Sequence, residues 1–150
     1  MVGTSGTTGA AQQQRIEQNV SKHLDQMFTP LLFSAHCNAV HMPYIEGEVS
    51  KVAKTDGVKG MRDGTFGQLI GLMQMAGDET LGADRRQRIV ALIGADASKF
   101  AVPLSENQRR QVISTAIGLQ KTLPANAQPQ LDQLKKAMEA TECGKMCSTT

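Results

Sequence analysis

Cysteines and histidines are the residues of this chain whose types and spacing could do chemistry. Cys37 lies four residues before His41, and Cys143 lies four residues before Cys147, so each pair would share one face of a helix. Thiolate sulfur and imidazole nitrogen are ligands that zinc prefers, and four of them complete its tetrahedral shell. One hypothesis for these four residues is therefore a metal site.

A disulfide is the competing hypothesis. On regular helix turns the Cβ atoms of Cys143 and Cys147 would lie about 6 Å apart, beyond the roughly 3.5 to 4.5 Å that a bridge needs. Cys37 is therefore expected to bond one of them and to close a loop of about a hundred residues, stabilising the fold by on the order of 4 to 5 kcal/mol. A break at Gly144 would instead let the two late cysteines bond each other, and three free thiols are the remaining alternative.

Nothing in the sequence assembles a catalytic site. A cysteine nucleophile needs a base within reach, and only His41 could serve Cys37, whose thiol is expected to be buried and inert between Phe33 and Val40. His23, His36 and His41 are expected to pack with one ring nitrogen bonded to a backbone carbonyl. The glycines between positions 57 and 67 lack the Lys-Ser or Lys-Thr ending of a phosphate loop. We therefore expect a protein that is not an enzyme and holds no cofactor.

Five arginines near predicted helix starts are candidate binding residues. The helix dipole disfavours cations at this end, so a binding role could explain their position. Guanidinium groups beside unpaired helix N–H donors suit the carboxylates of a partner. The predicted surface for an acidic protein consists of Arg85, Arg86, Arg88, Arg109 and Arg110. The alternative is a solvated face that Asp84 and Glu106 partly neutralise.

The composition limits the class of protein. The 150 residues are 40% hydrophobic and 20% charged, as expected of one folded domain. No apolar run approaches the roughly 18 residues of a membrane-spanning helix. The net charge of +2 and the five aromatic residues disfavour nucleic acid as a partner.

Apolar residues recur every three to four positions, which predicts helices throughout. The first is expected to bury a stripe of Ile16, Val20, Leu24, Met27 and Phe28. Capping boxes are expected at Thr65 with Gln68 and at Ser105 with Gln108, and a loop at 56–64. The expected helices are 12–28, 31–43, 44–54, 65–77, 84–94, 105–123 and 129–141, and a kinked continuation at the early prolines is an equal alternative. No run alternates with period two, so the fold class is all-α: one compact domain of six or seven short helices, orthogonal or bundle-like.

The two ends bear on location. Residues 1–11 are rich in Gly, Ser and Thr and are expected to form a disordered tail, followed by a helical domain at 12–147 and a frayed end at 148–150. The start has no signal-peptide pattern, so the protein is either cytoplasmic or has lost a leader. The late cysteines favour the second option, a periplasmic or secreted protein.

The sequence thus favours a non-enzymatic helical binding protein of an exported compartment, such as an inhibitor or immunity-type partner of another protein. The alternative is a metal-binding or metal-carrying protein that uses Cys37, His41, Cys143 and Cys147.

Overall fold

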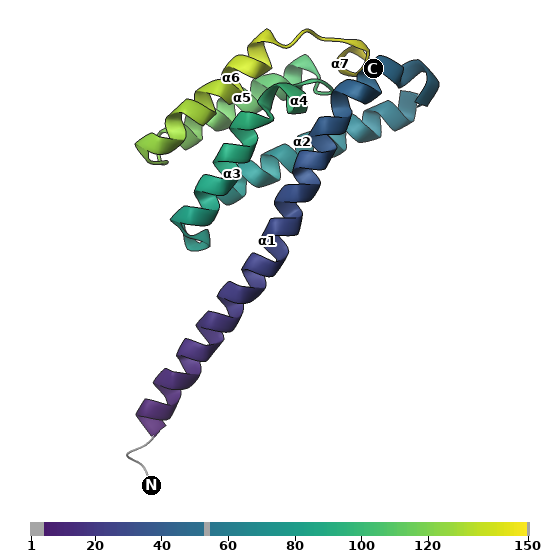
Figure 1. Cartoon of the computed structure of the whole chain (residues 1–150). Helices are drawn as coiled ribbons and strands as arrows, with labels where there is room; N and C mark the ends of the chain where they lie inside the picture. Colours follow the sequence, from purple (N-terminus) through teal and green to yellow (C-terminus); the bar gives the residue numbers. More distant parts are fainter. Residues whose placement is uncertain (1–4, 53–54, 150) are drawn as a thin grey trace. The chain divides into compact units, whose positions relative to one another are not determined.

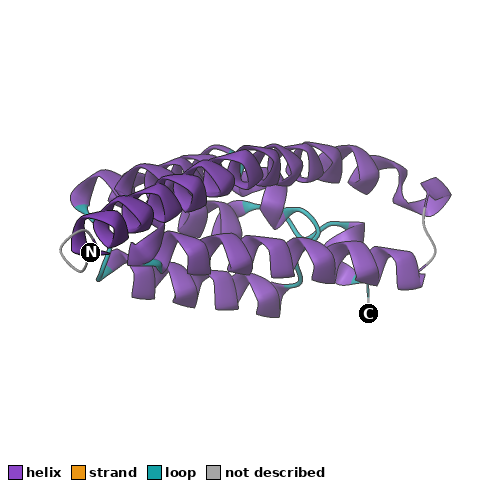
Figure 2. Ribbon diagram, turned by 90° about the horizontal axis from the view of Figure 1, so that it is seen from below, coloured by secondary structure: helices purple, strands orange, loops and turns teal. Residues whose placement is uncertain are grey.

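The computed structural model describes residues 5–52 and 55–149, and within these ranges every regular element is a helix (Figures 1 and 2). The predicted all-α class is confirmed. None of the described helices has the length and apolar character needed to cross a bilayer. The elements are α1 (Ser5–Val52), α2 (Thr55–Gly77), η2 (Glu79–Leu81), α3 (Ala83–Ala95), α4 (Ala97–Ala101), α5 (Glu106–Gln120), η3 (Ala125–Ala127), α6 (Gln128–Ala140) and α7 (Lys145–Ser148).

The chain divides into two units, Met1–Ser34 and Ala35–Thr150. We call residues 9–34 of α1 the arm, and the described residues from 35 to 149 the helical domain. Of the predicted disordered tail, residues 1–4 lie outside the described residues, and the chain is part of α1 from residue 5. Of the predicted frayed end, Ser148 closes α7 and residue 150 lies outside the described residues.

Helix α1 is continuous through the three helices predicted between residues 12 and 54, so a continuation, the alternative to separate helices, is what the structure contains. Pro30 and Pro43, taken as boundaries, lie inside it. A proline within a helix costs about 3 kcal/mol because it removes one backbone hydrogen bond and crowds the preceding turn. In the helical domain this cost is offset by burial on both sides of Pro43, where Met42 and Val49 pack with Val58 and Met146.

The predicted loop at 56–64 is wrong, because these residues form the first turns of α2. Val58, Thr65 and Leu69 are buried at helical spacing, and this burial outweighs the low helix propensity of the intervening glycines. Thr65 is therefore not a helix cap. Its hydroxyl lies inside the domain, 3.8 Å from the Met42 sulfur, and 3.3 Å from the Asn38 amide.

Two central helices organise the core of the helical domain. Helix α6 packs against α3, α4 and α5, while α2 packs against α3, α5 and α7. The close approach of α3 to α6 depends on Gly94, since a Cβ there would lie only 2.8 Å from the Cβ of Gln130. The largest fully buried side chains include Phe100, Leu69, Leu72, Met73, Ile89, Ile93, Leu104, Leu131, Leu134 and Met146.

Helix ends follow local signals only in part. The Ser105 and Gln108 capping box is confirmed, and a proline at the start of α6 agrees with the predicted start at Pro129. Helix α3 begins at Ala83, one residue before the predicted start, and follows Gly82, whose φ of 87° suits glycine. The short helices α4 and α7 were not predicted.

Candidate functional site

The arm carries an exposed apolar stripe. Ile16 is 49% exposed, Val20 54% and Met27 66%, and Leu24 and Leu31 are also exposed. The prediction that this stripe is buried is therefore wrong for Ile16, Val20, Leu24 and Met27 and correct for Phe28, which is 3% exposed. The four residues are exposed because the described part of the first unit contains one helix and no second element of that unit that could cover them.

The arm has a polar side as well. Gln18, Ser21, Lys22, Asp25 and Gln26 line a shallow hollow there. On the apolar side a second shallow hollow of about 350 Å³ is bordered by Asn19, Val20, His23, Leu24 and Met27. An amphipathic helix with an exposed apolar stripe of this length is typical of an interaction surface.

The five predicted binding arginines lie on two helices, three on α3 and two on α5. Arg86 donates to the carbonyl of Ala76 at the end of α2, at 2.8 Å. The adjacent Gly77 faces Leu119, near the last turn of α5. Arg109 and Arg110 lie in the opening turns of α5.

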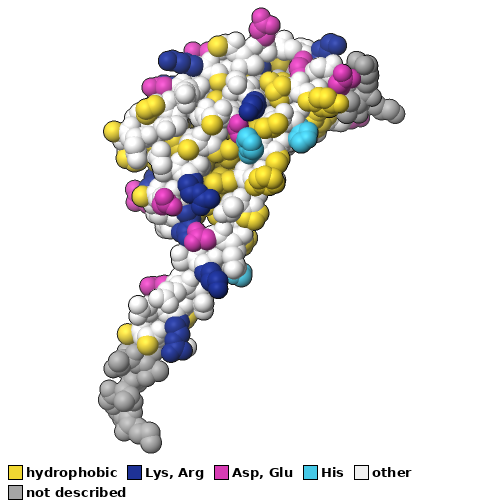
Figure 3. Space-filling model, in the orientation of Figure 1, with side chains coloured by type: hydrophobic (Ala, Val, Ile, Leu, Met, Phe, Trp, Pro, Cys, Tyr) yellow, Lys and Arg dark blue, Asp and Glu magenta, His cyan; other side chains and the backbone are white. Residues whose placement is uncertain are grey.

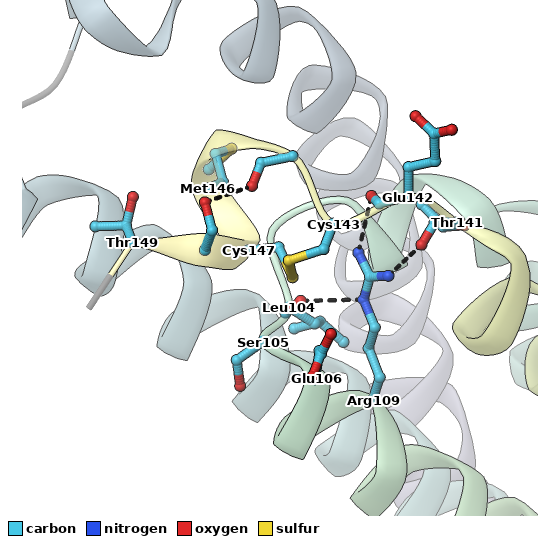
Figure 4. Close-up of a disulfide and its surroundings, with 12 residues drawn as sticks. Leu104, Ser105, Glu106, Arg109, Thr141, Glu142, Cys143, Met146, Cys147 and Thr149 are labelled. Atoms are coloured by element: carbon cyan, nitrogen blue, oxygen red, sulfur yellow. Dashed lines mark hydrogen bonds between the residues drawn. A yellow bond between two sulfur atoms is a disulfide. The ribbon is translucent and has the colours of Figure 1, made fainter.

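Arg109 has a structural role, which corrects the expectation that it contacts a partner. Its residue is only 5% exposed. Its guanidinium donates to the carbonyls of Leu104 at 3.0 Å, Glu142 at 3.4 Å and Thr141 (Figure 4). It also donates to the carbonyl of Ala101, at 2.8 Å. It therefore joins the end of α4 to the segment that follows α6.

Burial lowers the pKa of the Arg109 guanidinium from its ordinary value, and the nearby Glu106 carboxylate partly opposes this shift. The buried guanidinium is satisfied by its hydrogen bonds to four backbone carbonyls, which offset the cost of burying a charge. The sequence signal that placed Arg109 at a helix start was correct about position but could not reveal that carbonyl groups from distant residues would meet there.

The other arginines have varied surroundings. Arg85 donates to the carbonyl of Leu81, at 3.3 Å, and Arg110 forms an exposed pair with Glu106, at 3.7 Å. Arg88 is exposed and also takes part in an interaction. For Arg85, Arg86, Arg88 and Arg110 a role in binding an acidic protein stays a prediction.

The disulfide joins Cys143 to Cys147, and Cys37 is free (Figure 4). The prediction that Cys37 bonds a late cysteine is therefore wrong. Its premise was a regular helix through 143–147, but α6 ends at Ala140 and a new helix begins at Lys145 after Gly144. This break brings the two Cα atoms to 5.2 Å, inside the range that a disulfide spans.

Helix α7 is held at both ends. The Glu46 carboxylate of α1 accepts hydrogen bonds from the backbone N–H of Lys145 and, at 2.9 Å, of Met146. Arg62 of α2 donates to the carbonyls of Met146 and Thr149. Met146 itself is fully buried beside Met42 and Val58. These contacts fix the last helix independently of the disulfide.

A cavity of about 270 Å³ lies beside the disulfide. Its charged lining includes both arginine and glutamate side chains, and its apolar lining consists of side chains from α5 and α6. The lining residues are Glu106, Arg109, Arg110, Ile113, Met138, Glu139, Thr141 and Cys143. Sequence reasoning missed this cavity, because it forms between segments about thirty residues apart.

The histidines of α1 differ in their partners. His41 places Nδ1 2.7 Å from the carbonyl of Cys37, as expected for a packed histidine. His36 instead places Nδ1 2.6 Å from the carboxylate of Asp96, which is 3% exposed and also pairs with Lys99 at 3.3 Å. Hydrophobic side chains reach the surface of the molecule (Figure 3), and the exposed ones on α1 include Val40 and Tyr44. Asp96 was missed because its partner His36 lies sixty residues away in the sequence, so no local pattern connects the two.

The four residues of the metal hypothesis do not assemble. Two of them, Cys143 and Cys147, are bonded to each other and cannot act as thiolates. Within residues 5–52 and 55–149, no group of three or more His, Cys, Asp or Glu side chains is placed to hold a metal ion.

Comparisons with protein-family models, with curated proteins and with solved structures find no match for this chain.

Proposed function

We propose that this chain is a non-enzymatic binding protein whose arm pairs with the arm of a second copy. The observation that carries the proposal is the exposed stripe of Ile16, Val20, Leu24, Met27 and Leu31. About 25 cal/mol is gained for each Å² of apolar surface that leaves water, so a stripe of this kind favours association. A second copy of the chain can cover this stripe, and it is present wherever the protein is.

The positions in the stripe favour an antiparallel pair. Ile16 and Leu31 lie equally far from the midpoint between His23 and Leu24, and so do Val20 and Met27. In an antiparallel pair centred on this midpoint, Ile16 of each copy faces Leu31 of the other, and Val20 faces Met27. A two-fold interface is self-complementary in this way, because each contact occurs twice. The apolar hollow of the arm lies at the centre of this register.

The proposal also covers the compartment in which the protein is found and a second partner, an acidic protein. The Cys143–Cys147 disulfide supports an oxidising, exported compartment, since such bonds are rare in reducing ones. Arg85, Arg86 and Arg88 of α3 remain the proposed contacts for an acidic protein. Such a protein would be the target of an inhibitor or immunity-type partner.

Site-directed crosslinking tests the pairing. In a Cys37→Ser background, Ile16→Cys and Leu31→Cys variants are oxidised separately and as a mixture. Antiparallel pairing predicts an Ile16→Cys to Leu31→Cys heterodimer in the mixture and little product from either variant alone. Products from each variant alone would indicate parallel pairing, and no product in any sample would contradict self-association. A Gln18→Cys variant on the polar side of the arm is the control and should not crosslink.

A further inference from the structure

The disulfide at the C-terminal end is asymmetric. The Cys143 residue is exposed and lines the cavity of about 270 Å³, while Cys147 is 5% exposed. A thiolate that attacks a disulfide must reach one sulfur, and the other sulfur then leaves. Access in this molecule therefore selects Cys143 as the sulfur that is attacked and Cys147 as the leaving group.

The surroundings keep the two cysteines in place when the bond between them is open. Glu46 holds the N-terminal N–H groups of α7, Arg62 holds its C-terminal carbonyls, and Met146 is buried in the core. On the other side Arg109 binds the carbonyls of Thr141 and Glu142, the two residues before Cys143 (Figure 4). A Cys147 released by exchange therefore stays beside Cys143 and can re-form the bond.

The cavity has chemistry that suits a small charged thiol. Arg110 provides an exposed guanidinium for a carboxylate, Glu106 and Glu139 provide carboxylates for an ammonium group, and Ile113 and Met138 provide apolar contacts.

We propose that Cys143–Cys147 is a thiol–disulfide exchange site for low-molecular-weight thiols that carry both a carboxylate and an ammonium group. The thiolate of the small molecule attacks Sγ of Cys143, the bond to Cys147 breaks, and Cys147 leaves as a thiolate that takes a proton from water. The product is a mixed disulfide at Cys143. A second small thiol then attacks the small-molecule sulfur of this bond, so that two thiols become one small disulfide and the protein gains two electrons and two protons as a dithiol.

Mixed-disulfide formation tests the asymmetry, with glutathione as the probe. In a Cys37→Ser background, reduced Cys147→Ser and its matched variant Cys143→Ser are mixed with oxidised glutathione, quenched with acid and weighed by mass spectrometry. We expect Cys143 in the first variant to form its adduct at least about tenfold faster than Cys147 in the second. Equal rates would overturn the assignment of Cys143 as the attacked sulfur.

The wild-type pair provides the second test. Across glutathione redox buffers, the proposal predicts that Cys143 and Cys147 convert between disulfide and dithiol while the circular dichroism of the helices is unchanged. A disulfide that opens only together with loss of helical signal would be purely structural and would overturn the proposal.

Charge variants test the cavity. Arg110→Glu should slow adduct formation with oxidised glutathione by about threefold or more, because it repels the carboxylates, and should leave the rate with cystamine unslowed, since cystamine has no carboxylate. Lys121→Glu makes the same charge change at the far end of α5 and should have no effect. Equal slowing by both variants would show a general charge effect and would overturn the cavity as the binding site.

Discussion

The arm and the helical domain use similar apolar spacing with opposite results. In the helical domain, Ala35, Ala39, Met42 and Val49 of α1 are buried by other helices of the domain, whereas the arm exposes Ile16, Val20, Leu24, Met27 and Leu31. The domain even buries charged groups, Arg109 and Asp96, with hydrogen-bonding partners for each. The periodicity thus shows which residues form the apolar face of a helix. Whether this face is buried depends on the elements that pack against it.

The largest effect is expected at the buried arginine of the domain. Arg109→Leu leaves the carbonyls of Leu104, Ala101, Thr141 and Glu142 without their donor, and we expect a loss of about 3 to 5 kcal/mol in the free energy of unfolding. Urea denaturation measures it. Arg110→Leu, at the exposed neighbouring position, should change stability by less than about 0.5 kcal/mol. Similar losses for the two variants would contradict the structural role of Arg109.

Truncation along α1 separates the two regions directly. Met42→Ala removes a buried side chain and should cost about 2 to 4 kcal/mol of unfolding free energy. Leu24→Ala in the arm should leave the unfolding of the domain unchanged within about 0.5 kcal/mol, since it opens no cavity there. Thermal and urea unfolding at a low protein concentration measure both. A loss at Leu24 as large as that at Met42 would mean that the arm is packed rather than exposed.

Removal of the disulfide should have an intermediate effect. The bond closes a loop of only about five residues, so the chain-entropy model gives about 2 kcal/mol, less than the long loop through Cys37 would have given. We therefore expect the double variant Cys143→Ser and Cys147→Ser to remain helical and to lose about 2 kcal/mol in urea denaturation. Loss of the folded state would show that Glu46 and Arg62 do not hold α7 without the bond.

Two glycines provide the smallest effects, of opposite sign. Gly94→Ala places a Cβ 2.8 Å from that of Gln130 and should cost about 1 to 2 kcal/mol, because α3 must move away from α6. Gly71→Ala in α2 meets nothing within 4 Å and should stabilise the protein by about 0.5 to 1 kcal/mol through helix propensity. Differential scanning calorimetry compares them. The same sign for both would contradict the packing of α3 on α6.

The sequence predicted what short-range chemistry controls. The Ser105 and Gln108 capping box was correct because both hydrogen bonds lie within one turn. Thr65 and Gln68 have the same spacing, yet Thr65 is interior, because Val58 and Leu69 extend α2 across a glycine-rich stretch by tertiary burial. No local pattern could have revealed this.

The candidate sites also divide into features set by short-range spacing and features set by tertiary packing. The bond between Cys143 and Cys147 depends on a helix break near Gly144 that spacing alone does not fix. Arg109 was identified as unusual for its position at a helix start, but its four carbonyl partners come from segments up to about thirty residues away. The arm stripe was recognised by its periodicity, and its exposure follows from the absence of a covering element among residues 5–34 of the first unit.

Self-association of the arm is tested most directly by analytical ultracentrifugation of the wild type, Leu24→Glu and Gln18→Glu. The two variants add the same charge to the apolar and the polar side of one helix. We predict that the wild type and Gln18→Glu move from the 16.1 kDa monomer toward twice that mass as concentration rises, while Leu24→Glu stays monomeric. A wild type that remains monomeric at every concentration, or a Leu24→Glu variant that dimerises as the wild type does, would contradict the proposal.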